Sequence, residues 1–136
     1  LQEKTKMPLA AGENISGDVD FDEALRSGTL AVVQPDIAKW GGLSRGLSFA
    51  RRIQAAGLRF CPHYLGGGVG LLASAHLLAA VGGDGLMEID SNDNPLRESL
   101  QGPLLSIHEG RARLDEKPGI GIEPDLVALQ PYRVTY

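Results

Sequence analysis

Short apolar runs alternate with helix-like segments through the first two thirds of the chain. Four continuous apolar runs have the length of buried strands and lie at Pro8–Gly12, Leu30–Gln34, Leu58–Pro62 and Leu86–Ile89. Continuous rather than alternating runs are typical of parallel strands that are covered on both faces. Apolar spacing and terminal signals predict helices between them, at Asp18–Arg26, Leu43–Ala56 and Val69–Val81. The resulting β-α-β-α-β-α-β order predicts an α/β fold with a parallel sheet.

The glycine content indicates repeated sharp turns between packed elements. Glycine supplies 18 of the 136 residues, against a usual share of about 7%. The clusters Gly41-Gly42, Gly66-Gly67-Gly68 and Gly82-Gly83 each separate two apolar segments.

The last third of the chain has a different pattern. Residues 104–108 and 111–115 flank Glu109-Gly110, a signal for a hairpin, and the sequence beyond them reads as irregular. We expect the boundary near Asn94-Pro95 or Gly102-Pro103, which gives a repeating unit over residues 1–100 and a tail over residues 101–136.

Composition argues against several functional classes. A net charge of −4 gives no basic footprint for nucleic acid, and no apolar run reaches the roughly 18 residues of a membrane span. A single cysteine, Cys61, rules out an internal disulfide framework and predicts a reducing, cytoplasmic location. The chain begins with Leu1 and has no signal-peptide pattern, so we expect a fragment or a processed product.

Ionisable residues recur at the ends of the four apolar runs. Glu13, Asp36, His63 and Glu88 follow one another at separations of 23, 27 and 25 residues. A (β/α) barrel repeats at about this interval, and its catalytic groups lie at the carboxyl ends of its strands. Taken alone, each residue also fits an ordinary role: a solvated loop for Glu13, a turn cap for Asp36, a packed core imidazole for His63, and an ion pair with Arg97 or Lys39 for Glu88. The shared phase favours a joint site.

The chemistry of these groups suggests a proton-transfer site. Glu13 offers a hard oxygen ligand of the kind that magnesium prefers, although further ligands have to come from elsewhere. Asp36 and His63 lie on consecutive runs, and a carboxylate that accepts a hydrogen bond from an imidazole fixes its tautomer. Glu88 could donate a hydrogen bond as a neutral acid. Together these groups match the abstraction of a proton α to a carboxylate.

Four separated strings resemble the last four barrel strands of the enolase superfamily, in its mandelate racemase and muconate lactonizing branch. The strings are PLAAGEN, VVQPDIAKWGGLS, CPHYLGGGVGLLASAHLLAA and GLMEIDSNDNPLR. The resemblance covers Met7 to Arg97 and extends more loosely to PGIGIEPD in the tail. It implies about four βα units, which is the C-terminal half of a (β/α) barrel of the TIM type.

The resemblance also implies a role for each matching residue. Glu13 would be the third carboxylate ligand of an essential magnesium ion, and Asp36 with His63 would form a dyad in which His63 is the general acid/base. Glu88 would hydrogen-bond the substrate carboxylate or the enediolate. An aspartate at position 36 favours racemases and acid-sugar dehydratases, so we expect a small carboxylic acid such as an acid sugar as substrate. The same motifs suggest further substrate contacts at Lys39, Asn14 and Tyr64.

The chain departs from this family because it starts at the fifth barrel strand. Two metal ligands and the opposing base would lie upstream, and the tail would pack on an upstream capping domain. We therefore expect little activity from these residues alone, and a homo-oligomer when the enzyme is complete.

Two other functions stay open at this point. Gly66–Gly68 precedes a helix and could bind phosphate through backbone amides, as barrel enzymes often do after the late strands. The chain could also be a remnant without catalytic activity.

Overall fold

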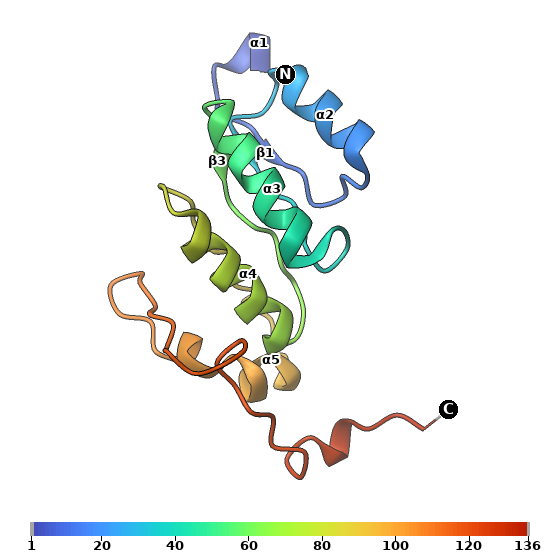
Figure 1. Cartoon of the computed structure of the whole chain (residues 1–136), viewed down its shortest axis with the longest axis vertical. Helices are drawn as coiled ribbons and strands as arrows, with labels where there is room; N and C mark the ends of the chain where they lie inside the picture. The colour runs from blue at the N-terminus through green and yellow to red at the C-terminus, as the bar shows by residue number, and fades with distance from the viewer. Residues whose placement is uncertain (1, 136) are drawn as a thin grey trace.

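Three short parallel strands, each followed by a helix, form a sheet in the first half of the chain (Figure 1). The computed structural model describes residues 2–135. The strands pair in the order β1-β2-β3. The elements in chain order are α1 (Gln2–Thr5), β1 (Ala10–Ala11), α2 (Asp18–Arg26), β2 (Val32–Val33), α3 (Gly42–Ala55), β3 (Arg59–Phe60), α4 (Gly68–Val81) and α5 (Pro95–Leu100), with 3₁₀ turns η1 (Gly102–Leu105) and η2 (Gln130–Tyr132).

The parallel α/β arrangement and the three helices that the sequence predicts are confirmed. The helix α2 has the predicted bounds, while α3 and α4 each begin one residue earlier than expected. The strands are shorter than the apolar runs, but their hydrogen bonding continues beyond them. From Arg59 to His63, every second amide of the third run donates to a carbonyl of the second run, at 3.0–3.2 Å. The polar residues that follow the runs are therefore held in the register of the sheet.

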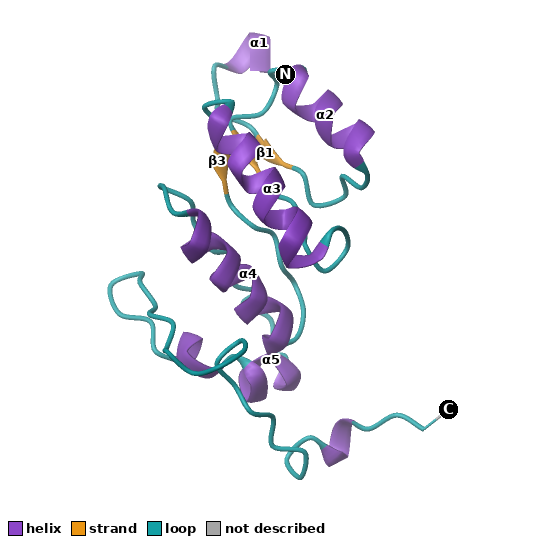
Figure 2. Ribbon diagram, in the orientation of Figure 1, coloured by secondary structure: helices purple, strands orange, loops and turns teal. Residues whose placement is uncertain are grey.

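Helix α3 lies between α2 and α4 and in front of the strands (Figure 2). The main core lies between these layers and is built around three aromatic rings. Phe49 of α3 stands 4.4 Å from Phe21 of α2 and 4.1 Å from Trp40, measured between ring centroids. The apolar face of each amphipathic helix is thus buried against its neighbours, as helical spacing requires.

Helix α4 is apolar on nearly all sides because it is covered on nearly all sides. Leu71, Leu72 and Ala75 form a second buried cluster with Leu104, and Ile120 and Ile122 of the tail pack against it. His76 fits this packing role, because its Nε2 lies 3.2 Å from the carbonyl oxygen of Ile120. Among the residues that the structure describes, no helix is long and apolar enough to cross a membrane.

The prediction of a fourth strand at Leu86–Ile89 is wrong, since the described backbone has no strand there. The segment does run beside β3: a Cβ on Gly85 would collide with the Phe60 carbonyl oxygen. The Leu86 amide, however, donates to the Cys61 sulfur at 3.2 Å instead of to a backbone carbonyl. A strand needs a ladder of carbonyl partners, and an apolar run does not by itself provide one.

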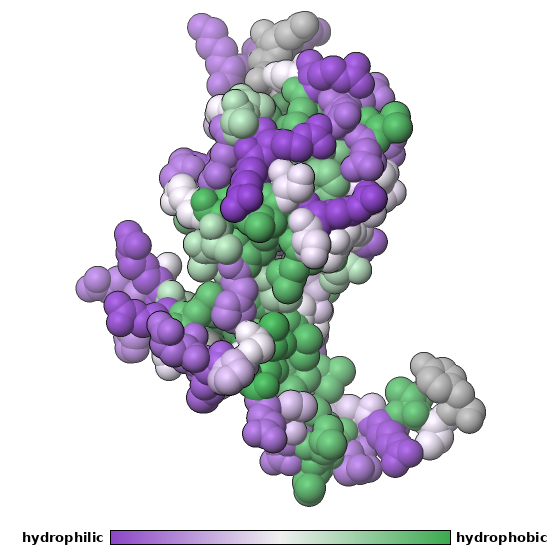
Figure 3. Space-filling model, in the orientation of Figure 1, coloured by the Kyte–Doolittle hydropathy of each residue, from purple (hydrophilic) through white to green (hydrophobic). Residues whose placement is uncertain are grey.

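The predicted hairpin is reduced to its turn. His108 and Arg111 exchange two backbone hydrogen bonds of 2.9 Å around Glu109-Gly110, and both turn residues have positive φ, 52° and 73°. The flanking segments are not strands in the described chain. The tail also exposes apolar side chains, including Leu126, Val127 and Val134, and green apolar surface extends along it in Figure 3.

The sequence analysis did not predict α5. Asn94 caps this helix by accepting hydrogen bonds from the amides of Leu96 and Arg97, and Pro95 takes the first helical position. Both are standard signals for a helix start.

We predict that Gly85→Ala will destabilise the fold. The added methyl group meets backbone at Phe60 and the Leu78 side chain, so the segment has to move away from β3. We expect a loss of about 1–3 kcal/mol in the free energy of unfolding, measured by urea denaturation. Gly67→Ala is the control, because its Cβ would make only an ordinary contact of 3.7 Å with Leu96. Equal losses in the two variants would contradict the prediction.

Candidate active site

The ladder between the second and third runs brings His63 against Asp36. The His63 amide donates to the Pro35 carbonyl at 3.2 Å, which places the two residues side by side just beyond the strands. His63 Nδ1 lies 3.1 Å from Asp36 Oδ2. Both residues are buried, at 6% exposure each. The predicted contact between these side chains is present.

Asp36 is fixed by its own turn as well as by His63. Its Oδ1 accepts the backbone amides of Ala38 at 2.8 Å and Lys39 at 3.3 Å, an arrangement typical of aspartate at the start of a turn. One carboxylate oxygen thus anchors the turn and the other faces the imidazole. A proton on His63 Nδ1 would be donated to Asp36 Oδ2, because a carboxylate oxygen can only accept.

Two further carboxylates approach the other side of the His63 ring. Glu13 Oε2 lies 3.0 Å from Nε2, and Glu88 Oε2 lies 3.8 Å from the same atom. The Glu13 side chain is half exposed, whereas Glu88 Oε2 is buried and has no hydrogen-bond partner among the described residues. The four residues that the sequence singled out by phase therefore converge on one imidazole.

Gly12 and two neighbouring polar groups position Glu13. Gly12 has φ of 137°, and a Cβ there would lie 2.9 Å from the Gln34 backbone nitrogen, so glycine allows the chain to leave β1 close to β2. Asn14 Nδ2 donates to Glu13 Oε1 at 3.3 Å, and Lys39 Nζ donates to Asn14 Oδ1 at 3.2 Å. Sequence reasoning placed Asn14 and Lys39 at the site but did not anticipate this link to Glu13.

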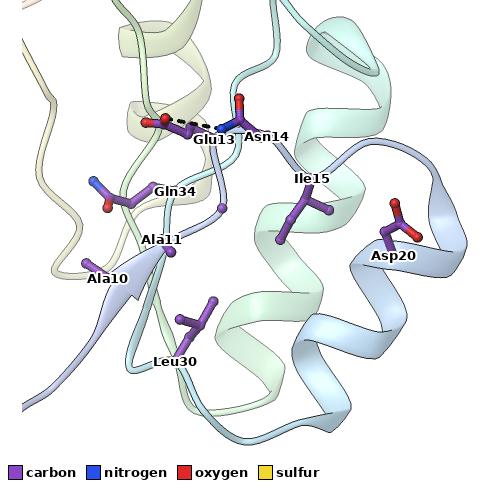
Figure 4. Close-up of a pocket in the computed structure, with 9 residues that line it drawn as sticks. Ala10, Ala11, Glu13, Asn14, Ile15, Asp20, Leu30 and Gln34 are labelled. Carbon is purple, nitrogen blue, oxygen red and sulfur yellow. Dashed lines mark hydrogen bonds between the residues drawn. The ribbon is translucent and has the colours of Figure 1, made fainter. Parts of the chain in front are cut away.

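An open depression of about 610 Å³ lies beside β1, with Glu13 and Asn14 at its edge (Figure 4). Ala10 and Ala11 line it, and both are exposed. Strand β1 is an edge strand that pairs only with β2 in the described sheet. Glu13 therefore lies at an open edge of the sheet, which another segment of polypeptide could approach.

Tyr64 points toward α4 instead of joining these carboxylates. Its ring occupies the space that side chains at Gly66 and Gly70 would need, and it packs against the second buried cluster. Burial and then the negative charge of Asp36 raise the pKa of the Tyr64 phenol. The neighbouring glycines serve the same packing, because a Cβ on Gly68 would collide with the Leu100 backbone.

The described residues contain no group of three or more histidine, cysteine, aspartate or glutamate side chains arranged to hold a metal ion. Glu13 is nevertheless suited to be one ligand of a hard cation, since it is half exposed at the open edge and has carboxylate oxygens. Such a site would need oxygen ligands from outside residues 2–135.

We predict that Tyr64 ionises at higher pH than an exposed tyrosine. The unfolded chain ionises first, so folding stability falls as the pH rises above about 10 and through the raised pKa of the folded state. Titration followed by phenolate absorbance should show a late phase that Tyr64→Phe removes. Tyr132→Phe, at a position with 46% exposure, is the control and should leave the late phase in place. A single ordinary phase in the unaltered chain would contradict this expectation.

Comparisons with known proteins place the chain in a family. Residues 1–128 match the family described as enolase C-terminal domain-like. A mandelate racemase/muconate lactonizing enzyme from Bordetella bronchiseptica superimposes with a TM-score of 0.88 at 58% identity, over 92% of this chain and 35% of that one.

Two curated relatives act on sugar acids or their lactones, according to their names. The D-galactarolactone cycloisomerase of Agrobacterium fabrum is 31% identical over 94% of this chain and 36% of its own length. The arabinonate dehydratase of Saccharolobus solfataricus is 27% identical over 89% and 32%. The chain thus spans about a third of the length of these relatives. Its sequence, its parallel α/β fold and its match over residues 1–128 show that it belongs to the enolase superfamily, in the mandelate racemase/muconate lactonizing enzyme family.

Proposed function

We propose that the chain is the C-terminal part of a longer acid-sugar dehydratase and supplies the proton-transfer side of its active site. The observation that carries this proposal is the buried His63 imidazole, held by Asp36 on one nitrogen and faced by Glu13 and Glu88 on the other. A buried imidazole held by a carboxylate is a group suited to general acid–base catalysis.

His63 would act through Nε2 on the carbon next to the substrate carboxylate. The Cα–H bond breaks, the proton passes to Nε2, and the electron pair moves into the carboxylate to give an enediolate. The electron pair then returns to form a carbon–carbon double bond as the β-hydroxyl leaves, and the proton from His63 completes a water molecule. Asp36 holds the ring in place throughout, because its other oxygen is tied to the amides of Ala38 and Lys39.

Glu88 would hydrogen-bond the substrate carboxylate or the enediolate. Its Oε2 is buried, has no hydrogen-bond partner among the described residues and lies beside the His63 ring, where the reacting carbon would be placed. A donor placed where negative charge develops stabilises the transition state more than the ground state.

Glu13 would be the ligand that this chain contributes to magnesium, the ion that members of the superfamily bind. When bound, the ion would neutralise the negative charge that forms on the substrate carboxylate. The excess of carboxylates around a single imidazole supports a cation at this place, and the open side of β1 gives other ligands access. Asn14 and Lys39 would orient Glu13 through their hydrogen bonds and face the substrate beyond it.

We further propose that residues 1–100 form half of a TIM-type barrel and that residues 101–136 pack on an upstream capping domain. The exposed edge of β1 and the exposed apolar side chains of the tail support this division. Dehydration of an acid sugar is supported by the relatives that are named dehydratases, while another relative is named a cycloisomerase. The close contacts at Gly66 and Gly68 favour a packing role for this loop over a phosphate site.

We also propose that the complete enzyme is a cytoplasmic homo-oligomer.

We predict that His63→Asn will abolish exchange of the substrate α-proton. The enzyme to test is full-length, with residues 1–136 joined to the upstream part that the Bordetella relative has. Nuclear magnetic resonance in deuterated water should show exchange slowed at least about 100-fold on a panel of acid sugars, because the proton acceptor is lost. His108→Asn, at an exposed turn, is the control and should exchange normally. Retained exchange in His63→Asn would refute the assigned role.

We predict that Glu13→Gln will weaken magnesium binding by the same full-length enzyme. Removing a residue that only hydrogen-bonds a metal ligand lowers metal affinity about 10- to 100-fold, so removing the ligand itself should lower it at least as much. Isothermal titration with magnesium chloride measures this directly. Glu123→Gln, on the exposed tail, should bind magnesium as the unaltered enzyme does. Equal affinities in the three proteins would contradict the ligand assignment.

A further inference from the structure

Arg97 is a buried cation whose position no catalytic step explains. Its side chain is 9% exposed, although an arginine side chain is almost never buried unless it is paired. Its Nη2 donates to the Asn92 carbonyl at 2.6 Å, and its Nη1 lies 3.7 Å from Asp90 Oδ2. Nη1 has no hydrogen-bond partner among the described residues. Burying a guanidinium is unfavourable, so the contacts that it makes have to offset a substantial desolvation cost.

These contacts close the turn that follows the fourth apolar run. Asp90 Oδ1 accepts both the backbone amide of Asn92, at 3.0 Å, and its side-chain amide, at 2.7 Å. These hydrogen bonds, together with the charge of Arg97, lower the pKa of Asp90. Asn94 caps α5 at the amides of Leu96 and Arg97. The segment from residue 90 to residue 97 is therefore held by hydrogen bonds among its own residues and by the contacts of Arg97 with Asn92 and Asp90.

Glu88 depends on this loop because its own segment lacks a strand ladder. The amide of Leu86 donates to the Cys61 sulfur, and within the described part of the chain the next hydrogen bonds of this segment are those at Asp90. Glu88 lies between these two anchors, with a buried Oε2 that makes no hydrogen bond with the described residues. The position of the Glu88 carboxylate, 3.8 Å from His63 Nε2, therefore depends on the backbone anchors on both sides of Glu88.

We infer that Arg97 is a positioning residue that acts through Asp90 and Asn92 to hold the Glu88 carboxylate at the His63 ring. This inference rests on the proposed function, in which Glu88 touches the enediolate. Arg97 itself touches no substrate.

The test uses the full-length enzyme defined above and compares Arg97→Met, Arg97→Lys and Arg59→Gln. Arg97→Met removes the charge at similar bulk, and we expect kcat for α-proton exchange to fall about 10- to 100-fold with little change in KM. Arg97→Lys keeps the charge and should recover part of this loss. Arg59→Gln is the matched control. It removes the exposed ion pair with Asp84 at the other end of the same segment and should leave kcat unchanged.

Two further measurements separate positioning from general stability. Hydrogen exchange of the peptide over residues 86–93 should speed up in Arg97→Met and stay unchanged in Arg59→Gln. In a Glu88→Gln background, Arg97→Met should cost much less kcat than it does in the unaltered enzyme, because the group that it positions is already gone.

Each outcome decides between the two proposals. If Arg97→Met lowers kcat equally in both backgrounds, or does not change it, the positioning role is overturned while the proposed function stands. If Glu88→Gln alone leaves exchange intact, the assigned role of Glu88 in the proposed function fails. If Arg97→Met does not fold, Arg97→Lys and Asp90→Asn are measured in its place. An unchanged kcat in both of these variants overturns the inference.

Discussion

The buried hydrogen bond between His63 and Asp36 is the interaction on which the rest of the site depends. It joins the ends of two neighbouring runs, and both partners are almost fully buried. Removing either side chain would leave the other buried without its partner, a loss of about 1–3 kcal/mol. The same contact holds the ring in place, so it contributes to the stability of the sheet edge and to the chemistry proposed there. Glu13 and Glu88 lie against the other nitrogen of this ring.

The bounds of α2, α3 and α4 could be predicted closely, whereas three of the four predicted strands are present but shorter than expected and the fourth is missing, for a physical reason. A helix makes its hydrogen bonds within one segment, so spacing and end signals such as the acidic start of Asp18–Arg26 mark it well. A strand depends on a neighbouring segment whose register the sequence does not state. The fourth run has the composition of a strand, but the Leu86 amide donates to the Cys61 sulfur, and no ladder follows. The cap and proline at Asn94-Pro95 were readable signals for α5 that we interpreted as a boundary.

The phase of the four ionisable residues was enough to predict that they meet, because parallel strands in register bring equivalent ends together. Their detailed contacts were beyond the sequence. Nothing in it shows that Glu13 would face His63 Nε2, or that Lys39 would reach Asn14 instead of standing free. Tyr64 follows His63 directly, and its ring packs toward α4 because adjacent residues of an extended chain point to opposite sides. The burial of Arg97 could not be predicted from the sequence either, since arginines in similar helices are exposed.

The alternate-amide ladder between the second and third runs also affects how this protein can misfold. A slip of two residues would keep every side chain on its proper face, so burial of apolar groups alone would hardly penalise it. It would, however, move His63 about 6.6 Å along the sheet, out of reach of Asp36. An imidazole and a carboxylate would then both be enclosed without partners, which strongly disfavours that alignment. The same two side chains thus select the correct alignment of the strands while the sheet assembles.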